Sequence, residues 1–122
     1  MSALDLAVIA LFGAIGCVLR HAVTLAMPAS PWPWATFLCN VAGAFAIGLI
    51  AALLARSGLL TGRWRLALMT GLLGGFTTYS AFALDAVTLI ERRQLAAALT
   101  YALATTAAAL LACAAGLWLA RR

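Results

Sequence analysis

The residues most able to do chemistry form the block GGFTTYSAF at positions 74–82, in the middle of an apolar segment. That segment, 66–90, can cross about 30 Å of hydrocarbon, and Asp85 is its one charged residue. Glycine weakens a helix by about 1 kcal/mol, and backbone groups freed inside lipid must find other partners. Interrupted helices at membrane depth are typical of ion or substrate sites. The alternative is close helix packing through small residues, although packing does not require so many hydroxyls.

Other polar side chains lie inside apolar segments, where they are costly and often functional. Arg20 either reaches the headgroups from its segment end or places a fixed positive charge that attracts an anion to a vestibule. Asn40 carries two donors and an acceptor, which suit either a helix-to-helix hydrogen bond or a polar route. Asp85 fits a helix cap or an ion pair with an arginine at least as well as a role in transport.

Aromatic residues recur every three positions at Phe76, Tyr79 and Phe82, which predicts one shared helix face. Such a stripe commonly packs in a core. Because the edge of an aromatic ring is electropositive, an edge-on ring can also face an anion without carrying a formal charge. Tyr101 and Thr105 add hydroxyls in the last apolar segment, where threonine can instead bond its own helix backbone.

Four apolar segments must position these groups, at 4–27, 34–55, 66–90 and 95–120, and each is long enough to span a membrane. Alanine and leucine dominate them, which indicates helices rather than the alternating strands of a barrel. The chain is 66% hydrophobic and 9% charged, against about 25% charged in soluble proteins. We therefore predict an all-α membrane protein, a single four-helix transmembrane domain over residues 1–122 with a break in its third helix.

The net charge of +5 comes from arginines, which gather at the segment ends. This placement indicates anchoring to lipid headgroups, and we expect no nucleic-acid partner. An even number of spans puts both termini on one side of the membrane. That side holds Arg56, Arg63, Arg65, Arg121 and Arg122, and the other holds Arg92 and Arg93. The excess predicts termini in the cytoplasm.

Three motifs in chain order carry a resemblance to a known family: GAIGCVLR at 13–20, NVAG at 40–43, and GLLGGFTTYSAF at 71–82. They look like the signatures of the Fluc (CrcB) fluoride channels. The resemblance covers the whole chain in length, number of spans and motif order. The Gly-Gly-Phe-Thr-Thr-aromatic-Ser sequence is its specific part, whereas the glycine-rich first motif alone would be weak.

The resemblance implies a passive, fluoride-selective channel that exports fluoride across the bacterial cytoplasmic (inner) membrane and lowers fluoride toxicity. It implies an antiparallel, dual-topology homodimer, so the partners would be fluoride, membrane lipid and a second copy of the chain. It also implies a structural sodium ion at the dimer centre, held by the backbone carbonyls of Gly74 and Thr77.

By the same resemblance, the vestibule arginine is Arg20, and six side chains belong to the fluoride pathway: Asn40, Tyr79, Ser80, Phe82, Tyr101 and Thr105. Three positions depart from the family pattern. Tyr79 stands where phenylalanine is usual and adds a hydroxyl, and Ala81 stands where threonine is common and removes one. His21 stands where tyrosine is frequent.

Two other classes of protein fit the length and span count. A small four-span drug exporter of the multidrug-resistance type needs a deep acidic residue in its first span, where this chain has Arg20 and only Asp5 at the edge. A non-transporting membrane assembly subunit would use its small residues for packing alone. We do not expect an enzyme, because the sequence has no evident nucleophile–base pair or metal-ligand cluster.

Overall fold

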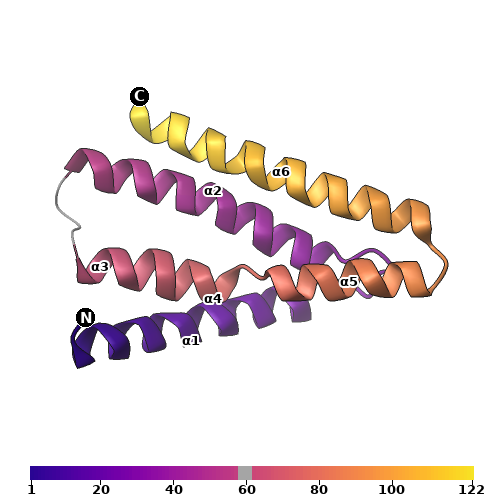
Figure 1. Cartoon of the computed structure of the whole chain (residues 1–122), viewed down its shortest axis with the longest axis horizontal. Helices are drawn as coiled ribbons and strands as arrows, with labels where there is room; N and C mark the ends of the chain where they lie inside the picture. Colours follow the sequence, from indigo (N-terminus) through magenta and orange to yellow (C-terminus); the bar gives the residue numbers. More distant parts are fainter. Residues whose placement is uncertain (58–61) are drawn as a thin grey trace.

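Four long helices make up the described part of the chain, residues 1–57 and 62–122, in this computed structural model (Figure 1). The third long helix is divided into α3 to α5, and both chain termini lie at the same end of the bundle. The elements in chain order are α1 (Ala3–Ala26), α2 (Trp34–Ser57), α3 (Arg63–Arg65), η1 (Leu66–Leu73), α4 (Gly74–Phe76), α5 (Tyr79–Glu91) and α6 (Leu95–Arg121).

Each of the four helices is long and apolar enough to cross a membrane. In the apolar window of each helix, only 6% to 22% of the residues are buried within the chain. Most of the leucine and valine side chains therefore face outward, where water would solvate them unfavourably and an apolar phase would not. The predicted all-α architecture with four candidate membrane spans is confirmed.

The start of α1 is capped and linked to the start of the third span. The Ser2 hydroxyl accepts a hydrogen bond from the Asp5 amide at 3.2 Å, and the Asp5 carboxylate accepts one from the Ser2 amide at 2.7 Å. This reciprocal capping box satisfies backbone donors at the helix start. Asp5 also pairs with Arg63 Nε at 2.9 Å, so the ion pair joins α1 to the span that contains the break.

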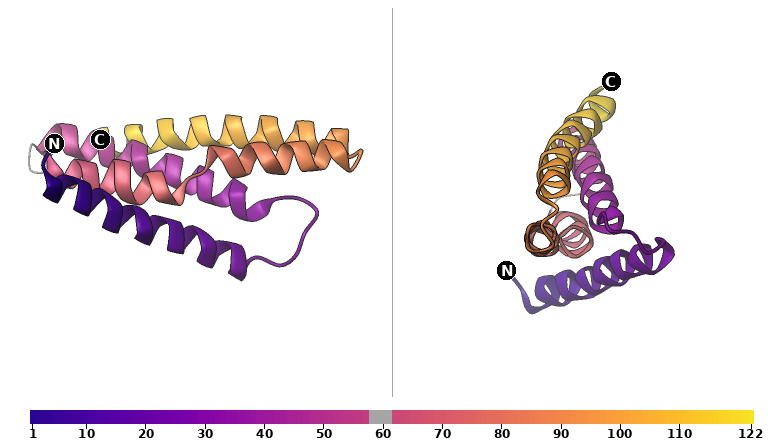
Figure 2. Two further views of the ribbon diagram at one scale, coloured as in Figure 1. Left: turned by 60° about the horizontal axis from the view of Figure 1, so that its bottom comes forward. Right: turned by 90° about the vertical axis from the view of Figure 1, so that its right-hand side faces the viewer.

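The helices associate mainly in two pairs, α1 with η1 and α4, and α2 with α6. Figure 2 shows α1 on one side of the third span and α6 on the other. Glycine allows the backbones of each pair to approach closely. A methyl group at Gly16 of α1 would overlap the Leu72 carbonyl, and one at Gly48 of α2 would overlap the Cys113 carbonyl.

The third span is broken, as predicted, but the break is narrower than the polar block and lies after the glycines. The residues Gly74–Phe76 are still helical, and the chain becomes extended at Thr77 (φ −85°, ψ 157°) and Thr78 (φ −154°, ψ 119°) before α5 begins. Before the glycines, η1 is a π-helix, whose hydrogen bonds reach one residue further than those of an α-helix. The sequence patterns did not predict that π-helix.

Candidate functional site

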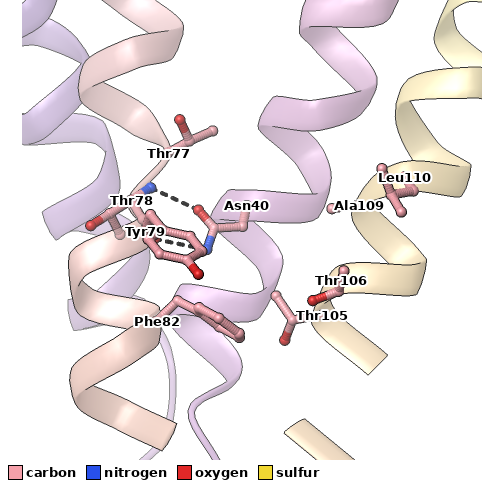
Figure 3. Close-up of a pocket in the computed structure, with 9 residues that line it drawn as sticks. All are labelled: Asn40, Thr77, Thr78, Tyr79, Phe82, Thr105, Thr106, Ala109 and Leu110. Atoms are coloured by element: carbon pink, nitrogen blue, oxygen red, sulfur yellow. Dashed lines mark hydrogen bonds between the residues drawn. The ribbon is translucent and has the colours of Figure 1, made fainter. Parts of the chain in front are cut away.

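Asn40 of α2 is bonded to the backbone of the break at two points. Its Oδ1 accepts a hydrogen bond from the Thr78 amide at 2.7 Å, and its Nδ2 donates one to the Thr78 carbonyl at 3.0 Å (Figure 3). These bonds hold Thr78 extended. They use the oxygen and one of the two N–H groups of the Asn40 amide, which leaves the second N–H available.

Several carbonyl oxygens at the break lose their helical donors, among them those of Gly74 and Thr77. In a continuous α-helix the Thr78 amide would bond to Gly74 and the Ala81 amide to Thr77. Here the Thr78 amide donates to Asn40, and the Ala81 amide donates to the Thr78 hydroxyl at 3.2 Å. The Gly74 and Thr77 carbonyls therefore have capacity for another partner, such as a cation.

Arg20 of α1 also reaches the break instead of extending toward the helix end. Its Nε donates a hydrogen bond to the Gly75 carbonyl at 3.2 Å, and its Nη2 lies 3.9 Å from Cys17 Sγ. The side chain is half-buried. The sequence allowed two interpretations of Arg20. The first, in which the side chain extends to the lipid headgroups, does not match this conformation.

A cavity of about 300 Å³ opens beside the break. Its wall is mostly apolar with a few hydroxyls and one amide, and Figure 3 draws the side chains that line it. The lining comes from α2, the break, α5 and α6, and consists of Asn40, Thr77, Thr78, Tyr79, Phe82, Thr105, Thr106, Ala109 and Leu110. Polar groups of three different spans thus converge on one space.

The two threonines of α6 in this wall differ in their hydrogen bonding. The Thr106 hydroxyl donates to the Ala102 carbonyl of its own helix at 2.8 Å. The Thr105 side chain is only 4% exposed, and its hydroxyl has no hydrogen-bond partner in the described part of the chain. A buried, unpaired hydroxyl costs about 1–3 kcal/mol, so the Thr105 hydroxyl would gain from a hydrogen-bond partner such as water or an ion.

The aromatic rings form a continuous contact on α5 and α6. The Tyr79 and Phe82 ring centroids are 5.5 Å apart, and those of Phe82 and Tyr101 are 5.3 Å apart. Tyr79 is 82% exposed, whereas Phe82 is half-buried. The prediction of one helix face for all three rings was wrong for Phe76, because it belongs to α4 on the other side of the extended residues.

Tyr101 lies deeper than the cavity wall and is fully buried. Its hydroxyl donates to the Asp85 carboxylate at 3.2 Å, and its ring packs edge-on against Trp32 at 5.2 Å. Asp85 lines a second pocket of about 270 Å³ near the connection between α1 and α2. The Asp85 carboxylate is therefore hydrogen-bonded to a tyrosine, in place of the helix cap or arginine pair favoured by the sequence.

The chain matches the family described as CrcB-like protein, Camphor Resistance (CrcB), over residues 7–117. It belongs to this family. A "Fluoride-specific ion channel FluC" of Chelativorans sp. (strain BNC1) is 50% identical over 119 residues, which cover 95% of each chain. Proteins of the same name from Caulobacter sp. (strain K31) and Agrobacterium fabrum are 43% and 42% identical, over 94% and 97% of their own lengths. The predicted family is confirmed.

In this CrcB-like chain the cavity brings together four of the predicted pathway residues: Asn40, Tyr79, Phe82 and Thr105. Ser80 and Tyr101 do not line it. The Ser80 hydroxyl lies on the exposed side of α5, 3.3 Å from the Thr78 hydroxyl. Thr77 is the first extended residue of the break, Gly74 begins the short helix before it, and Arg20 contacts the Gly75 carbonyl.

The sequence patterns predicted no role for Thr78 and did not predict Tyr101 as the partner of Asp85. Thr78 is the N-cap of α5 and the backbone partner of Asn40. Threonine is a preferred N-cap residue, so a search for capping residues inside the polar block could have found it. The contact between Asp85 and Tyr101 joins positions 16 residues apart on two helices, and no local pattern predicts such a pair.

Proposed function

We propose that this chain is a passive, fluoride-selective channel that exports fluoride across the bacterial cytoplasmic membrane and so lowers fluoride toxicity. The observation that carries this proposal is the near full-length identity to proteins named fluoride-specific ion channels, combined with donors converging on a cavity at the helix break. The chain is then a channel and not an enzyme.

The chemistry of the cavity suits a small, strongly hydrated anion. A pore must replace the water around such an ion with hydrogen-bond donors, yet hold the ion weakly enough to release it. The free N–H of Asn40, the unpaired hydroxyl of Thr105 and the ring edge of Phe82 supply donors and positive edges. No carboxylate lines this cavity among the described residues, so no fixed negative charge of its wall repels an anion.

The working unit in this proposal is an antiparallel homodimer. Tyr79 is 82% exposed, and Gly74 and Ser80 are also exposed, so a single chain would present the polar break to lipid. Backbone and hydroxyl groups in lipid without partners cost several kcal/mol each. A second copy that covers this face would remove that cost. The opposed orientation is what the family resemblance implies.

A structural sodium ion at the centre of that dimer fits the carbonyls of the break. The donors that would occupy the Gly74 and Thr77 carbonyls are bonded elsewhere, and neutral carbonyl oxygens are suitable ligands for a small alkali cation. Two-fold symmetry would bring the same two oxygens from each subunit. When bound, the ion would be coordinated by these oxygens and would join the subunits, without taking part in conduction.

The remaining predicted residues complete a path in this proposal. Arg20 places positive charge at the vestibule. From the cavity the path continues past Phe82 toward Ser80 and Tyr101, and the Tyr101 hydroxyl, bonded to Asp85 at 3.2 Å, lies at its far end.

The test is efflux from proteoliposomes loaded with potassium fluoride and followed with a fluoride electrode. Purified protein should release fluoride far faster than protein-free liposomes do, and chloride-loaded liposomes should release almost no chloride. Comparable chloride release would contradict the proposed selectivity. Coupled exchange of protons with an organic cation would instead identify a multidrug-type exporter, and no flux of any ion would indicate an assembly subunit.

A further inference from the structure

The contact between Arg20 and the break concerns a carbonyl that has lost its helical donor. In a continuous helix the Tyr79 amide would bond to the Gly75 carbonyl. Because Thr77 and Thr78 are extended, the Tyr79 amide makes no such bond in the described part of the chain. The Nε of Arg20 donates to this oxygen instead, at 3.2 Å.

The backbone packing of α1 places Arg20 within reach of this oxygen. A methyl group at Gly16 would overlap the Leu72 carbonyl, and one at Gly75 would overlap the Gly13 carbonyl. The two backbones are therefore in direct contact one turn before Arg20. From this position the side chain needs only its aliphatic part and Nε to reach the break, and the end of the guanidinium lies beside Cys17.

Arg20 and Asn40 act on opposite ends of the same short break. Asn40 bonds to both backbone groups of Thr78, from α2. Arg20 bonds to Gly75, from α1. Between them lie the residues whose backbone leaves the helix. Since the Gly75 oxygen already accepts a hydrogen bond from Arg20, it is less available to a cation than the Gly74 and Thr77 oxygens, whose helical donors are bonded elsewhere.

We propose that Arg20 is a positioning residue that holds the third-helix break through its Nε–H bond to the Gly75 carbonyl, in addition to any charge that it places in the vestibule. The bond satisfies the Gly75 oxygen, which then competes less with Gly74 and Thr77 for a sodium ion, and it fixes the orientation of the adjacent peptide groups. The inference concerning sodium rests on the proposed function, whereas the inference concerning the break does not.

Three substitutions separate the hydrogen bond from the charge, because of where each places its atoms. In Arg20→Gln, the amide nitrogen occupies the place of Nε, so the donor remains and the charge is lost. In Arg20→Lys the charge remains, but carbon stands in place of Nε. In Arg20→Met, both are lost at similar length. Arg121→Gln, which removes an exposed charge at the end of α6, is the control.

The first measurement is hydrogen–deuterium exchange of the peptide that contains residues 74–82, in the full-length protein. We expect the exchange of this peptide in Arg20→Gln to stay within about threefold of wild type, and in Arg20→Lys and Arg20→Met to be at least about tenfold faster, as loss of a charge-assisted hydrogen bond predicts. If Arg20→Met does not give a monodisperse protein, the comparison of Gln with Lys still decides. The Arg121→Gln control should exchange as wild type does.

The second measurement is the sodium concentration that gives half-maximal fluoride efflux, in protein purified without sodium. It should be close to that of wild type in Arg20→Gln and raised at least about tenfold in Arg20→Lys. A wild-type-like Lys variant with an impaired Gln variant would overturn the proposal, because charge alone would then matter. The proposal would also be overturned if Arg20→Gln, Arg20→Lys and Arg20→Met all matched wild type, or if all three were equally impaired. Absence of fluoride flux in wild type would contradict the proposed function, and the exchange comparison would still test Arg20.

Discussion

Asn40 has a structural role at the break and, in the proposed function, a second role in transport. Its two bonds to Thr78 fix the break, and its remaining N–H is near the cavity. We expect Asn40→Ala to slow fluoride efflux at least about tenfold, because the variant loses a donor for the dehydrated ion and leaves Thr78 unpaired. The measurement is electrode efflux from proteoliposomes containing equal amounts of dimeric protein. Wild-type flux in a well-folded Asn40→Ala dimer would remove Asn40 from the pathway.

Thr105 and Thr106 form a matched pair for testing which hydroxyl serves the ion. Valine has nearly the shape of threonine without the hydroxyl. Thr105→Val should slow fluoride efflux, because Thr105 lines the cavity and its hydroxyl has no partner among the described residues. It should also raise the free energy of unfolding by about 1 kcal/mol by removing a buried, unpaired group. Thr106→Val should leave efflux close to wild type, since that hydroxyl is bonded to Ala102. Equal effects of the two substitutions on efflux would contradict this assignment.

Substitutions at Tyr79 and Phe82 test whether aromatic ring edges or the Tyr79 hydroxyl interact favourably with the anion. The Tyr79 ring contacts Phe82, and its edge survives in Tyr79→Phe, so we expect that variant to keep most of the wild-type efflux. Phe82→Ile should lower efflux strongly, because the ring is lost while an apolar side chain remains. If the Tyr79 hydroxyl compensates for the donor missing at Ala81, Tyr79→Phe should instead be slow and Ala81→Thr should restore it. Normal efflux in folded Phe82→Ile would show that the ring only packs.

At the residue scale, the sequence predicted the polar groups more reliably than it predicted their partners. Asn40 and Thr105, two of the residues predicted for the pathway, both line the cavity, since amide and hydroxyl groups inside apolar segments have few inexpensive alternatives. The partners of Arg20 and Tyr101 are the Gly75 carbonyl and the Asp85 carboxylate. Both contacts depend on which helices pack together, and that information is not present in local sequence patterns.

At the element scale, the third span differs most from an ordinary helix. Its break was predictable, because glycines followed by threonines weaken a helix and threonine caps the next one. The π-helix of Leu66–Leu73 was not, since its residues LALMTGLL read as an ordinary apolar helix. The contact with α1 is made there through Gly71, whose substitution by alanine would crowd Phe12.

The pairing of α1 with the third span can be tested with two glycines of the same helix. An added methyl group at Gly16 would overlap the Leu72 carbonyl, whereas one at Gly13 would lie 3.8 Å from the Gly71 carbonyl, an ordinary contact. Gly16→Ala should lower the free energy of unfolding by about 1–3 kcal/mol. Gly13→Ala should leave it unchanged or raise it by up to about 1 kcal/mol, through helix propensity.

Thermal unfolding in detergent, followed by circular dichroism, measures both glycine variants under the same conditions. A Gly16→Ala protein as stable as Gly13→Ala would show that α1 and the third span can move apart at little cost. The close backbone packing would then not be what brings Arg20 to the break.

At the scale of the whole molecule, the distribution of arginines and the exposed polar residues predict different orientations of the chain in the membrane. The end of the bundle that holds both termini carries Arg56, Arg63, Arg65, Arg121 and Arg122, and the other end carries Arg92 and Arg93. An excess of this kind favours one orientation, with the termini in the cytoplasm. The exposed polar break favours a second copy on the same face, and an antiparallel copy requires both orientations in one membrane.

A single cysteine on the connection between α5 and α6 distinguishes these arrangements. Gln94 is exposed there, and Gln94→Cys can be made in a background in which Cys17, Cys39 and Cys113 are replaced by alanine. In an antiparallel dimer, a membrane-impermeant maleimide should label about half of the chains in sealed vesicles, and the rest only after permeabilisation. If the arginine excess instead set a single orientation, the cysteine at position 94 would lie on the side opposite the cytoplasm in every chain. Complete labelling from one side, in vesicles that still release fluoride, would therefore rule out the antiparallel arrangement and leave the polar break to be covered by a parallel copy.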